Sequence, residues 1–335
     1  LETRGLVQVE GAIGGAPGRS QLSYALRAEA ATALGFDVGG TKVAGAIADL
    51  RGHILAEHTE PTEGGSTSAL VAQLTRMVEA LREEAGVPRF RLHAMAIGVP
   101  AAVHPRTADL SLAGNLPGLE GSNLRAQLSQ ALGMDVQIEN DVNLALLGEV
   151  GQFSAEAPQN VAFIALGTGI GGALMVNGRL LRGAHGGAGE LGYMPLWTIG
   201  APGVPPLEER VGEAGIRRAF VAEGGDPALS VRDIFAAAEA GGAAAVAALD
   251  TAAEHVARAV LALLALLDTD MIVFGGSVGA RPEFIARVER RVAAAWMRPV
   301  NLIRSQSGGR AGLLGALELA RRHMLDDLFG PAPLR

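Results

Sequence analysis

A pair of glycines between an acidic and a basic residue interrupts an apolar strand near the start of the chain. The segment reads Leu34-Gly-Phe-Asp-Val-Gly-Gly-Thr-Lys42, and the strand resumes as Val43-Ala-Gly-Ala-Ile-Ala48. Because glycine has no Cβ, the backbone N–H groups of this pair can approach phosphate oxygens, and Lys42 adds a positive charge. Asp37 would repel bare phosphate, so we expect it to hold a hydrated Mg²⁺. The competing interpretation is a tight hairpin turn whose glycines serve geometry alone.

A second segment repeats this form. An apolar strand predicted from Val161 to Leu166 breaks into Gly167-Thr-Gly-Ile-Gly-Gly172 and resumes as Ala173-Leu-Met-Val176. One Gly-rich turn is weak evidence for a phosphate site, whereas a duplicated pair in two successive α/β halves is stronger. Two such hairpins facing each other across a cleft would hold a triphosphate from both sides.

Asn140 and Asp141 follow a short strand predicted at Val136-Gln-Ile138 and precede a helix predicted from Leu144 to Glu149. Open α/β sheets bind their ligands at the carboxyl ends of the strands. Asp141 could act there as a general base that accepts a hydroxyl proton, with Asn140 holding the substrate. The alternative is that the carboxylate only caps the following helix.

Two further segments could line the same site. A strand predicted from Thr269 to Phe274 leads into Gly275-Gly-Ser-Val-Gly279, a turn suited to a nucleoside base or ribose lying against backbone, although a plain crossover loop explains it as well. Glu190 is flanked by small residues that cannot bury it, so we expect it to face a cleft.

The length and composition limit the class of protein. A chain of 335 residues predicts two domains, and 4% aromatic residues with 46 glycines predict closely packed aliphatic cores. A net charge of -7 argues against a nucleic-acid surface on the bulk of the chain, and the absence of cysteine excludes disulfides and thiolate zinc sites. The longest strongly apolar run, 259–267, is far shorter than the ~20 residues that span a bilayer. We expect a cytoplasmic protein that does not bind membranes.

Residues 1–30 do not look like the start of a globular enzyme, and the first residue is not Met. Two strands are predicted, Leu6–Val9 and Gln21–Leu26, separated by a Gly/Pro loop from Gly11 to Gly18. We expect that something precedes this segment, because a β-hairpin followed by a Gly-Arg linker is how a winged-helix module would end. The competing interpretation is a disordered leader.

Together these motifs, in this order and spacing, resemble the ROK family of bacterial sugar kinases and sugar-responsive transcriptional regulators. The similarity runs from about residue 33 to the end. It implies an α/β chain with the two-domain actin/hexokinase-like (ribonuclease H-like) fold, with mixed sheets flanked by helices and an interdomain cleft. The expected domains are a wing and linker remnant at 1–32, a first α/β domain at 33–138 plus 313–335, and a second α/β domain at 139–312.

The resemblance also implies roles for particular residues. Asp141 matches the catalytic base. The positions that match nucleotide and phosphate contacts are Asp37, Gly39, Gly40, Thr41, Lys42, Gly167, Thr168, Gly169, Gly171, Gly275, Gly276 and Ser277. Those that match sugar contacts are Asn115, Asn140, Asp141, Glu190 and Glu208. ATP and Mg²⁺ are the cofactors that this pattern implies.

The chain departs from the family pattern where the family binds zinc. The family has a His that binds sugar and zinc at the position of Tyr193, and the zinc-binding cysteines expected before Glu208 are replaced by the Pro-rich segment 194–206. We therefore predict no bound zinc and a rebuilt sugar pocket. A smaller departure is Ala101, where the family usually has Gly.

Three functions remain open at this stage. The N-terminal segment and the altered zinc region favour a sugar-responsive transcriptional regulator, represented by its effector-binding and oligomerising part, which would contact DNA only through a missing N-terminal module. The alternative is an ATP-dependent kinase that phosphorylates a hexose or hexose derivative, because Asp141 and both phosphate motifs are intact. The third is a member that binds sugar without catalysis. We expect a small-molecule sugar as ligand and a homodimer or homotetramer.

Overall fold

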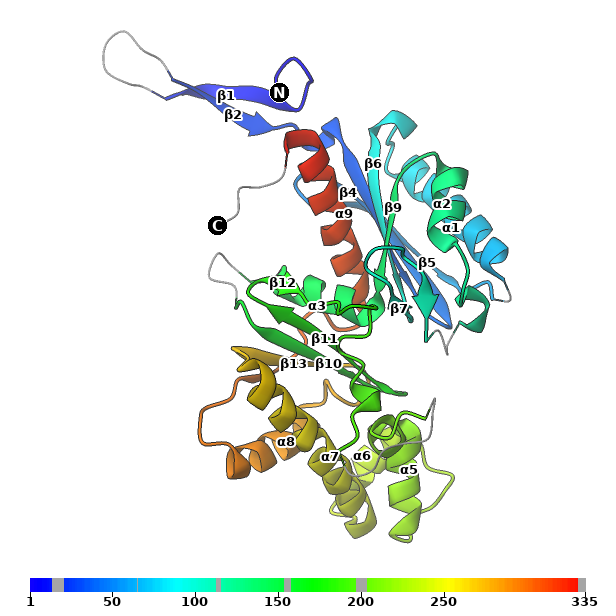
Figure 1. Cartoon of the computed structure of the whole chain (residues 1–335), viewed down its shortest axis with the longest axis vertical. Helices are drawn as coiled ribbons and strands as arrows, with labels where there is room; N and C mark the ends of the chain where they lie inside the picture. Colours follow the sequence, from blue (N-terminus) through cyan, green and yellow to red (C-terminus); the bar gives the residue numbers. More distant parts are fainter. Residues whose placement is uncertain (14–20, 65, 113–115, 154–157, 197–203, 331–335) are drawn as a thin grey trace. The chain divides into compact units, whose positions relative to one another are not determined.

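The computed structural model describes residues 1–13, 21–64, 66–112, 116–153, 158–196 and 204–330 (Figure 1). The chain forms two compact units. Unit 1 comprises Leu1–Gly148 and Gly312–Arg335, and unit 2 comprises Glu149–Ala311. This contact-based division places residues 141–148 in unit 1, and the domain assignment made from the sequence stays a prediction.

Unit 1 is built on a mixed five-stranded sheet. Its strand order is β5 (Ile54–Pro61), β4 (Lys42–Asp49), β3 (Thr32–Val38), β6 (Leu92–Val99) and β9 (Val136–Asn140). The strands β3, β4 and β5 form an antiparallel meander, whereas β6 and β9 are parallel to β3. The carboxyl ends of β3, β6 and β9 therefore lie at one edge of this sheet.

Large and small apolar residues alternate along the central strands and decide which helix covers each face of the sheet. Leu34, Phe36 and Met95 share a buried cluster with the apolar stripe of α1 (Thr67–Glu84) and with α2 (Leu124–Leu132). Ala33, Ala94 and Ala96 point to the opposite face and pack against α9 (Ala311–Phe329). Because side chains alternate with a period of two, the small residues leave room for a close helix on one face only.

Unit 2 repeats the same strand order and directions. The sheet runs β12 (Arg179–Leu180), β11 (Ile170–Val176), β10 (Val161–Leu166), β13 (Met271–Gly275) and β14 (Leu302–Arg304). The strands β10, β11 and β12 are antiparallel neighbours, and β13 and β14 are parallel to β10. The repeat of the Gly-rich hairpins noted in the sequence is thus part of a repeat of the whole sheet.

The helices of unit 2 are α4 (Glu208–Val211), α5 (Glu213–Ala222), α6 (Val231–Glu239), α7 (Ala243–Leu267) and α8 (Pro282–Ala295). They share a buried aliphatic cluster with the sheet. In the described residues no single helix is long and apolar enough to cross a membrane. The pair of α6 and α7 passes that test by length and composition, but it is bent by 113° at the break between the two helices.

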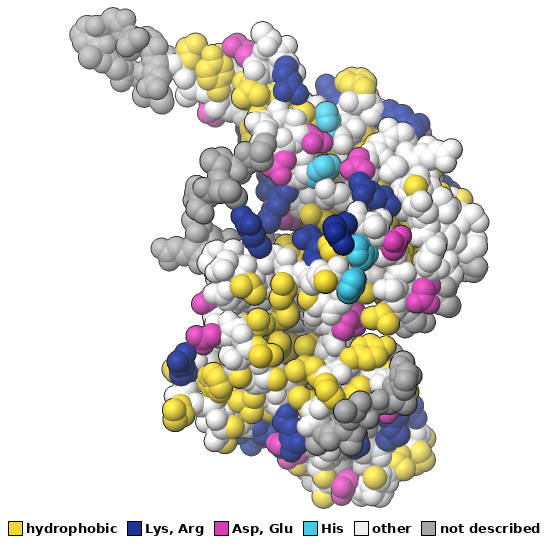
Figure 2. All heavy atoms as spheres, viewed as in Figure 1, with side chains coloured by type: hydrophobic (Ala, Val, Ile, Leu, Met, Phe, Trp, Pro, Cys, Tyr) yellow, Lys and Arg dark blue, Asp and Glu magenta, His cyan; other side chains and the backbone are white. Residues whose placement is uncertain are grey.

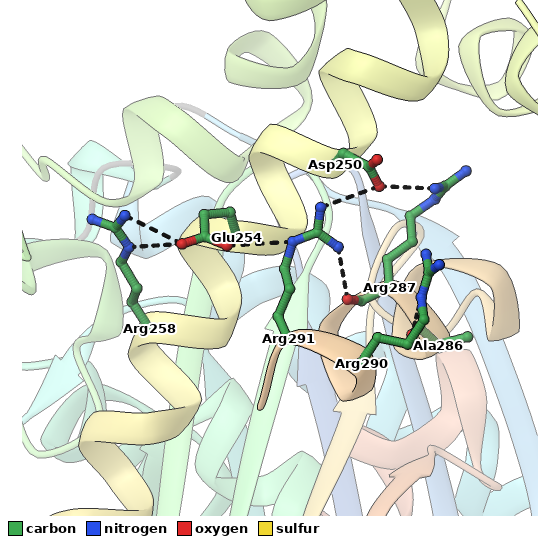
Figure 3. Close-up of polar contacts among 7 residues, drawn as sticks. All are labelled: Asp250, Glu254, Arg258, Ala286, Arg287, Arg290 and Arg291. Carbon is green, nitrogen blue, oxygen red and sulfur yellow. Dashed lines mark hydrogen bonds and ion pairs between the residues drawn. The ribbon is translucent and has the colours of Figure 1, made fainter. Parts of the chain in front are cut away.

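Ion pairs join α7 to α8 at the surface of unit 2 (Figure 3). Asp250 pairs with Arg287 at 2.9 Å and with Arg291 at 3.3 Å. Glu254 pairs with Arg291 at 3.4 Å and with Arg258 at 3.2 Å. Three of these pairs connect two helices that also share apolar contacts, so they reinforce an interface that burial already specifies, whereas the Glu254–Arg258 pair lies within α7.

The N-terminal segment forms an antiparallel hairpin of β1 (Val7–Ile13) and β2 (Gln21–Leu26), which extends beyond the main sheet of unit 1 (Figure 1). Val9 lies opposite Tyr24, and both side chains are about half exposed. Hydrophobic side chains on this hairpin are visible at the surface in Figure 2. The remaining short elements of the described chain are the strands β7 (Ala102–Val103) and β8 (Leu110–Ser111), the helix α3 (Asp141–Val150), and the 3-10 turns Ala28–Ala30, Arg89–Arg91, Pro117–Leu119, Leu191–Tyr193 and Gly308–Arg310.

Candidate functional site

The first Gly-rich hairpin is a tight connection between β3 and β4. Val38 pairs with Val43, and the N–H of Gly39 donates to the Lys42 carbonyl at 2.9 Å. The hydroxyl of Thr62 donates to the Gly39 carbonyl at 2.7 Å, which braces the turn from β5. Gly40, Thr41 and Lys42 are exposed. Their amides and the Lys42 ammonium are therefore accessible to an anion.

Asp37 lies in a space that two glycines leave open. A Cβ on Gly312 would stand 2.7 Å from Asp37 Oδ2, and one on Gly98 would stand 3.6 Å from Oδ1. Burial raises the pKa of the Asp37 carboxyl, although the charge of Lys42 partly opposes this effect. The carboxylate thus packs against two glycines and is poorly solvated. A carboxylate oxygen is a ligand that Mg²⁺ accepts, so Asp37 is the residue that would hold the expected ion, and this role stays a prediction.

Asn140 caps α3. Its Oδ1 accepts hydrogen bonds from the backbone N–H groups of Val142 at 2.9 Å and Asn143 at 3.0 Å, and its Nδ2 donates to the Ala101 carbonyl at 3.1 Å. Asp141 is the first residue of the helix, and its Oδ1 accepts a hydrogen bond from the Val142 N–H at 2.8 Å. The capping role that the sequence left open for the carboxylate thus falls mainly to Asn140, and its sugar contact stays a prediction.

The parallel register brings Asp141 near Asp37. Asp37 pairs with Gly98 across β3 and β6, and Gly98 pairs with Glu139 across β6 and β9. The position that a Gly98 Cβ would occupy is 3.6 Å both from Asp37 Oδ1 and from Asp141 Cα. The predicted metal-binding and base residues therefore lie on two sides of one glycine in unit 1.

The sequence analysis missed Glu139 and Asn143 as supports of this edge. Glu139 is 3% exposed, and its Oε1 accepts from the Asn140 N–H at 3.0 Å and from Asn143 Nδ2 at 2.9 Å. The sequence did carry a signal for this pair: a Glu at the end of a predicted strand, four residues before an Asn. These bonds hold the turn that presents Asp141.

The second Gly-rich hairpin, between β10 and β11, is bonded to Glu208. The N–H of Gly167 donates to the Gly169 carbonyl at 2.9 Å, and the N–H of Ile170 donates to Glu208 Oε2 at 3.0 Å. A Cβ on Gly169 would stand 2.1 Å from Glu208 Oε2, so any larger residue there would displace the Glu208 carboxylate. Glu208, a predicted sugar contact, thus also braces the phosphate turn.

Glu190 lies close enough to Glu208 for the two charges to interact. Burial raises the pKa of the Glu190 carboxyl, and the negative charge of Glu208 raises it further. Among the described residues there is no group of three or more His, Asp or Glu side chains that could hold a metal ion. Tyr193 is 39% exposed. Most of the Pro-rich segment lies outside the described residues, and the zinc prediction stays a prediction.

The third Gly-rich turn packs directly on the second hairpin. Gly276 has φ +84°, and a Cβ there would stand 2.2 Å from the Leu166 carbonyl oxygen. The hydroxyl of Ser277 donates to Glu213 Oε1 at 3.0 Å, and the N–H of Glu213 donates to the Gly167 carbonyl at 3.0 Å. The predicted phosphate and adenosine turns of unit 2 therefore form one connected surface.

The structure thus gathers the predicted residues into two sets. Unit 1 holds the first phosphate hairpin, Asn140 and Asp141, and unit 2 holds the second hairpin, the adenosine turn, Glu190 and Glu208. Asn115 lies outside the described residues.

Known proteins share this arrangement. A β-glucoside kinase from Listeria monocytogenes is 28% identical over 84% of this chain and 95% of its own. A ROK hexokinase from Thermus thermophilus is 30% identical, with a TM-score of 0.75 over 88% of this chain and 99% of its own. A ROK family glucokinase from Streptomyces griseus, solved with glucose and AMPPNP, is 26% identical, with a TM-score of 0.69 over 87% of this chain and 99% of its own.

The two repeated sheets with their hairpins are therefore those of the two-domain actin/hexokinase-like fold, which confirms the fold class predicted from the sequence. The sequence profile of the ROK family matches residues 33–323. The chain belongs to the ROK family.

The preference for a transcriptional regulator was wrong. The relatives and structures that match this chain are mostly named sugar kinases. A ROK family transcriptional regulator, a homolog of the E. coli MLC protein, has a TM-score of 0.82 over 98% of this chain and 87% of its own, but at 20% identity this likeness shows the fold alone. The preference rested on the N-terminal segment and on the altered zinc region, and neither feature bears on the chemistry of Asp141 and the phosphate motifs.

Proposed function

We propose that the protein is an ATP-dependent sugar kinase that phosphorylates a hydroxyl of a hexose or hexose derivative. The observation that carries the proposal is the position of Asp141: it begins a helix at the carboxyl edge of the sheet, beside Asp37 and the first phosphate hairpin. A general base next to a metal-binding carboxylate and anion-binding amides is the set of groups that phosphoryl transfer to an alcohol needs.

In this mechanism Asp141 accepts the proton of the attacking sugar hydroxyl. The amides of Gly40 and Thr41, the Lys42 ammonium and the amides of Thr168 and Gly169 would stabilise charge on the phosphates, and the turn at Gly276 would receive the nucleoside. Mg²⁺ near Asp37 would neutralise negative charge on the phosphates. Catalysis is then mostly positioning and electrostatic stabilisation.

Glu190 and Glu208 would accept hydrogen bonds from sugar hydroxyls. Carboxylates are strong acceptors, and the raised pKa of Glu190 shows that its charge is poorly solvated, so a hydroxyl donor there would gain more than one in water. Tyr193 cannot reproduce the contact of an imidazole. We therefore expect either a slow turnover or a preference for a sugar other than glucose.

The test is a panel of hexoses, N-acetylated hexosamines, pentoses and β-glucosides, each incubated with Mg-ATP and assayed for ADP and for sugar phosphate by mass spectrometry. The expected result is a sugar phosphate formed in equal amount to ADP from at least one hexose-type substrate. ADP formation that does not depend on sugar, or no product with any sugar, would contradict the proposal.

A further inference from the structure

A buried carboxylate closes the last turn of α3. Glu149 is 1% exposed, and both of its oxygens accept hydrogen bonds from a segment more than a hundred residues further along the chain. Oε1 accepts from Ser305 Oγ at 2.5 Å and from the Ser307 N–H at 2.9 Å, and Oε2 accepts from the Gln306 N–H at 3.0 Å. We call these four residues the Glu149 clasp.

The clasp lies at both points where the chain passes between the two units. Glu149 is the first residue of unit 2, directly after Gly148 of unit 1, and its three donors precede the return to unit 1 at Ala311–Gly312. All three donors bond to the one Glu149 side chain, and Glu149 and its donors belong to unit 2. The two chain crossings are therefore tied to each other inside unit 2.

One end of the clasp leads to the predicted nucleotide surface. The N–H of Ser305 donates to the Phe274 carbonyl at 2.8 Å, and Phe274 is the residue before the Gly275–Gly279 turn. The neighbouring residue Arg304 pairs with Phe274 in the β13–β14 ladder. Gly308 donates its N–H to Ser305 Oγ at 3.0 Å, which orders the loop around the carboxylate. A shift of the clasp would thus reach the adenosine turn through one hydrogen bond.

The other end leads to the candidate base. Asp141 and Glu149 are in one helix, α3, with Asp141 as its first residue. This helix packs tightly within unit 1, because a Cβ on Gly315 would stand 1.8 Å from the Leu144 carbonyl oxygen and one on Gly98 would stand 2.8 Å from Leu144 Cδ1. A helix packed in this way transmits a displacement at one end to the other rather than bending.

We propose that Glu149 is a positioning residue, which ties the helix that carries Asp141 to the strand ends that carry the adenosine turn. This inference rests on the proposed kinase function. In this proposal the clasp aligns Asp141 with the phosphoryl group. A misplacement of about 1 Å, even one that begins far from the chemistry, can cost about 100-fold in rate.

The kinetic test compares Glu149→Gln with wild type. In Glu149→Gln an NH2 group takes the place of one carboxylate oxygen and faces an N–H, so a hydrogen bond of the clasp is lost. We therefore expect kcat to fall about 10- to 100-fold. Because Glu149 is 1% exposed and so is shielded from a bound substrate, the calorimetric Kd values for ATP and sugar should stay within about twofold, and the stoichiometries should not change. Ser305→Ala removes one donor of three and should give a smaller loss. Glu83→Gln, an exposed carboxylate near the end of α1, is the matched control and should leave kcat unchanged.

A positioning role also predicts the rate of a double variant. If Glu149 acts through Asp141, then in an Asp141→Asn background the Glu149→Gln change should alter the residual rate by less than about twofold. The proposal would be overturned if Glu149→Gln lowers the rate as strongly in the Asp141→Asn background as in wild type. It would also be overturned if Glu149→Gln alone has the kcat of wild type.

A distance measurement decides the question even if no sugar is phosphorylated. The chain has no cysteine, so Ala72→Cys in unit 1 and Glu289→Cys in unit 2, both exposed, take spin labels at those two sites alone. We expect Glu149→Gln and, to a smaller extent, Ser305→Ala to broaden the distribution of distances between the labels, whereas Glu83→Gln leaves it unchanged. An unchanged distribution in Glu149→Gln and Ser305→Ala would overturn the clasp, whereas a lack of turnover in wild type would overturn only the proposed function.

Discussion

Two carboxylates of the candidate site have pKa values above those of ordinary side chains, and the cause differs between them. Burial raises the pKa of Asp37 against the opposing charge of Lys42, whereas burial and the neighbouring charge of Glu208 both raise the pKa of Glu190. Each group therefore takes up a proton at a higher pH than it would in the unfolded chain. At these positions acid pH removes the charge that Mg²⁺ or a sugar hydroxyl would bind.

This difference predicts the pH dependence of sugar use. As the pH falls through the raised pKa of Glu190, kcat/KM for the sugar should fall, and in Glu208→Gln the acid limb should move to lower pH, because the neutral amide no longer disfavours the Glu190 charge. Glu209→Gln, a change at an exposed neighbour, should leave the limb in place. The measurement is kcat/KM for the sugar from neutral to acid pH at saturating ATP. A limb that stays in place or moves upward in Glu208→Gln would contradict the assignment.

At the scale of single elements, the second hairpin depends on the absence of one methyl group. In Gly169→Ala the new Cβ would collide with Glu208 Oε2, so the carboxylate must move and its bond to the Ile170 N–H is lost. We expect ATP affinity, measured by calorimetry, to fall at least about tenfold, because the turn amides lose their orientation. Gly64→Ala, at a glycine with open space around the new Cβ, is the control. Equal affinities in the two variants would show that this turn does not contact the nucleotide.

The ion pairs between α7 and α8 should contribute modestly to stability (Figure 3). Asp250→Asn removes the charge that two partly buried arginines share, and we expect the free energy of unfolding to fall by about 1 kcal/mol in a denaturant titration. The matched control is Asp268→Asn, since its partner Arg298 is 71% exposed and an exposed pair contributes little. Similar losses in both variants would argue against a special role for the network.

Individual strands and turns could be predicted from the sequence, but the bonds across them could not. The apolar runs at Leu34 and Val161 and the glycines after them identified both hairpins, because period and turn chemistry are local properties. The bond from Asn140 Nδ2 to the Ala101 carbonyl and the use of Glu208 as a brace for Ile170 depend on contacts between segments 30 or more residues apart. No local pattern encodes those contacts.

At the scale of the whole molecule, the repeated sheet explains why the fold was predictable. Each main sheet has a Gly-rich hairpin between its first two strands and a turn with a predicted binding role after a parallel strand, so the same physical pattern occurs twice along the chain. The function was less accessible. Proteins of one fold differ in chemistry through a few side chains. The regulator interpretation failed because it gave the N-terminal hairpin more weight than the intact Asp141.

The most direct test of the kinase proposal is a comparison of wild type with Asp141→Asn, using the best sugar from the panel at saturating Mg-ATP. Asn keeps the shape of the side chain but cannot accept the hydroxyl proton, so kcat should fall by about three orders of magnitude while the Kd for sugar, measured by calorimetry, stays nearly unchanged. Equal rates of sugar phosphate formation by the two proteins would contradict the account.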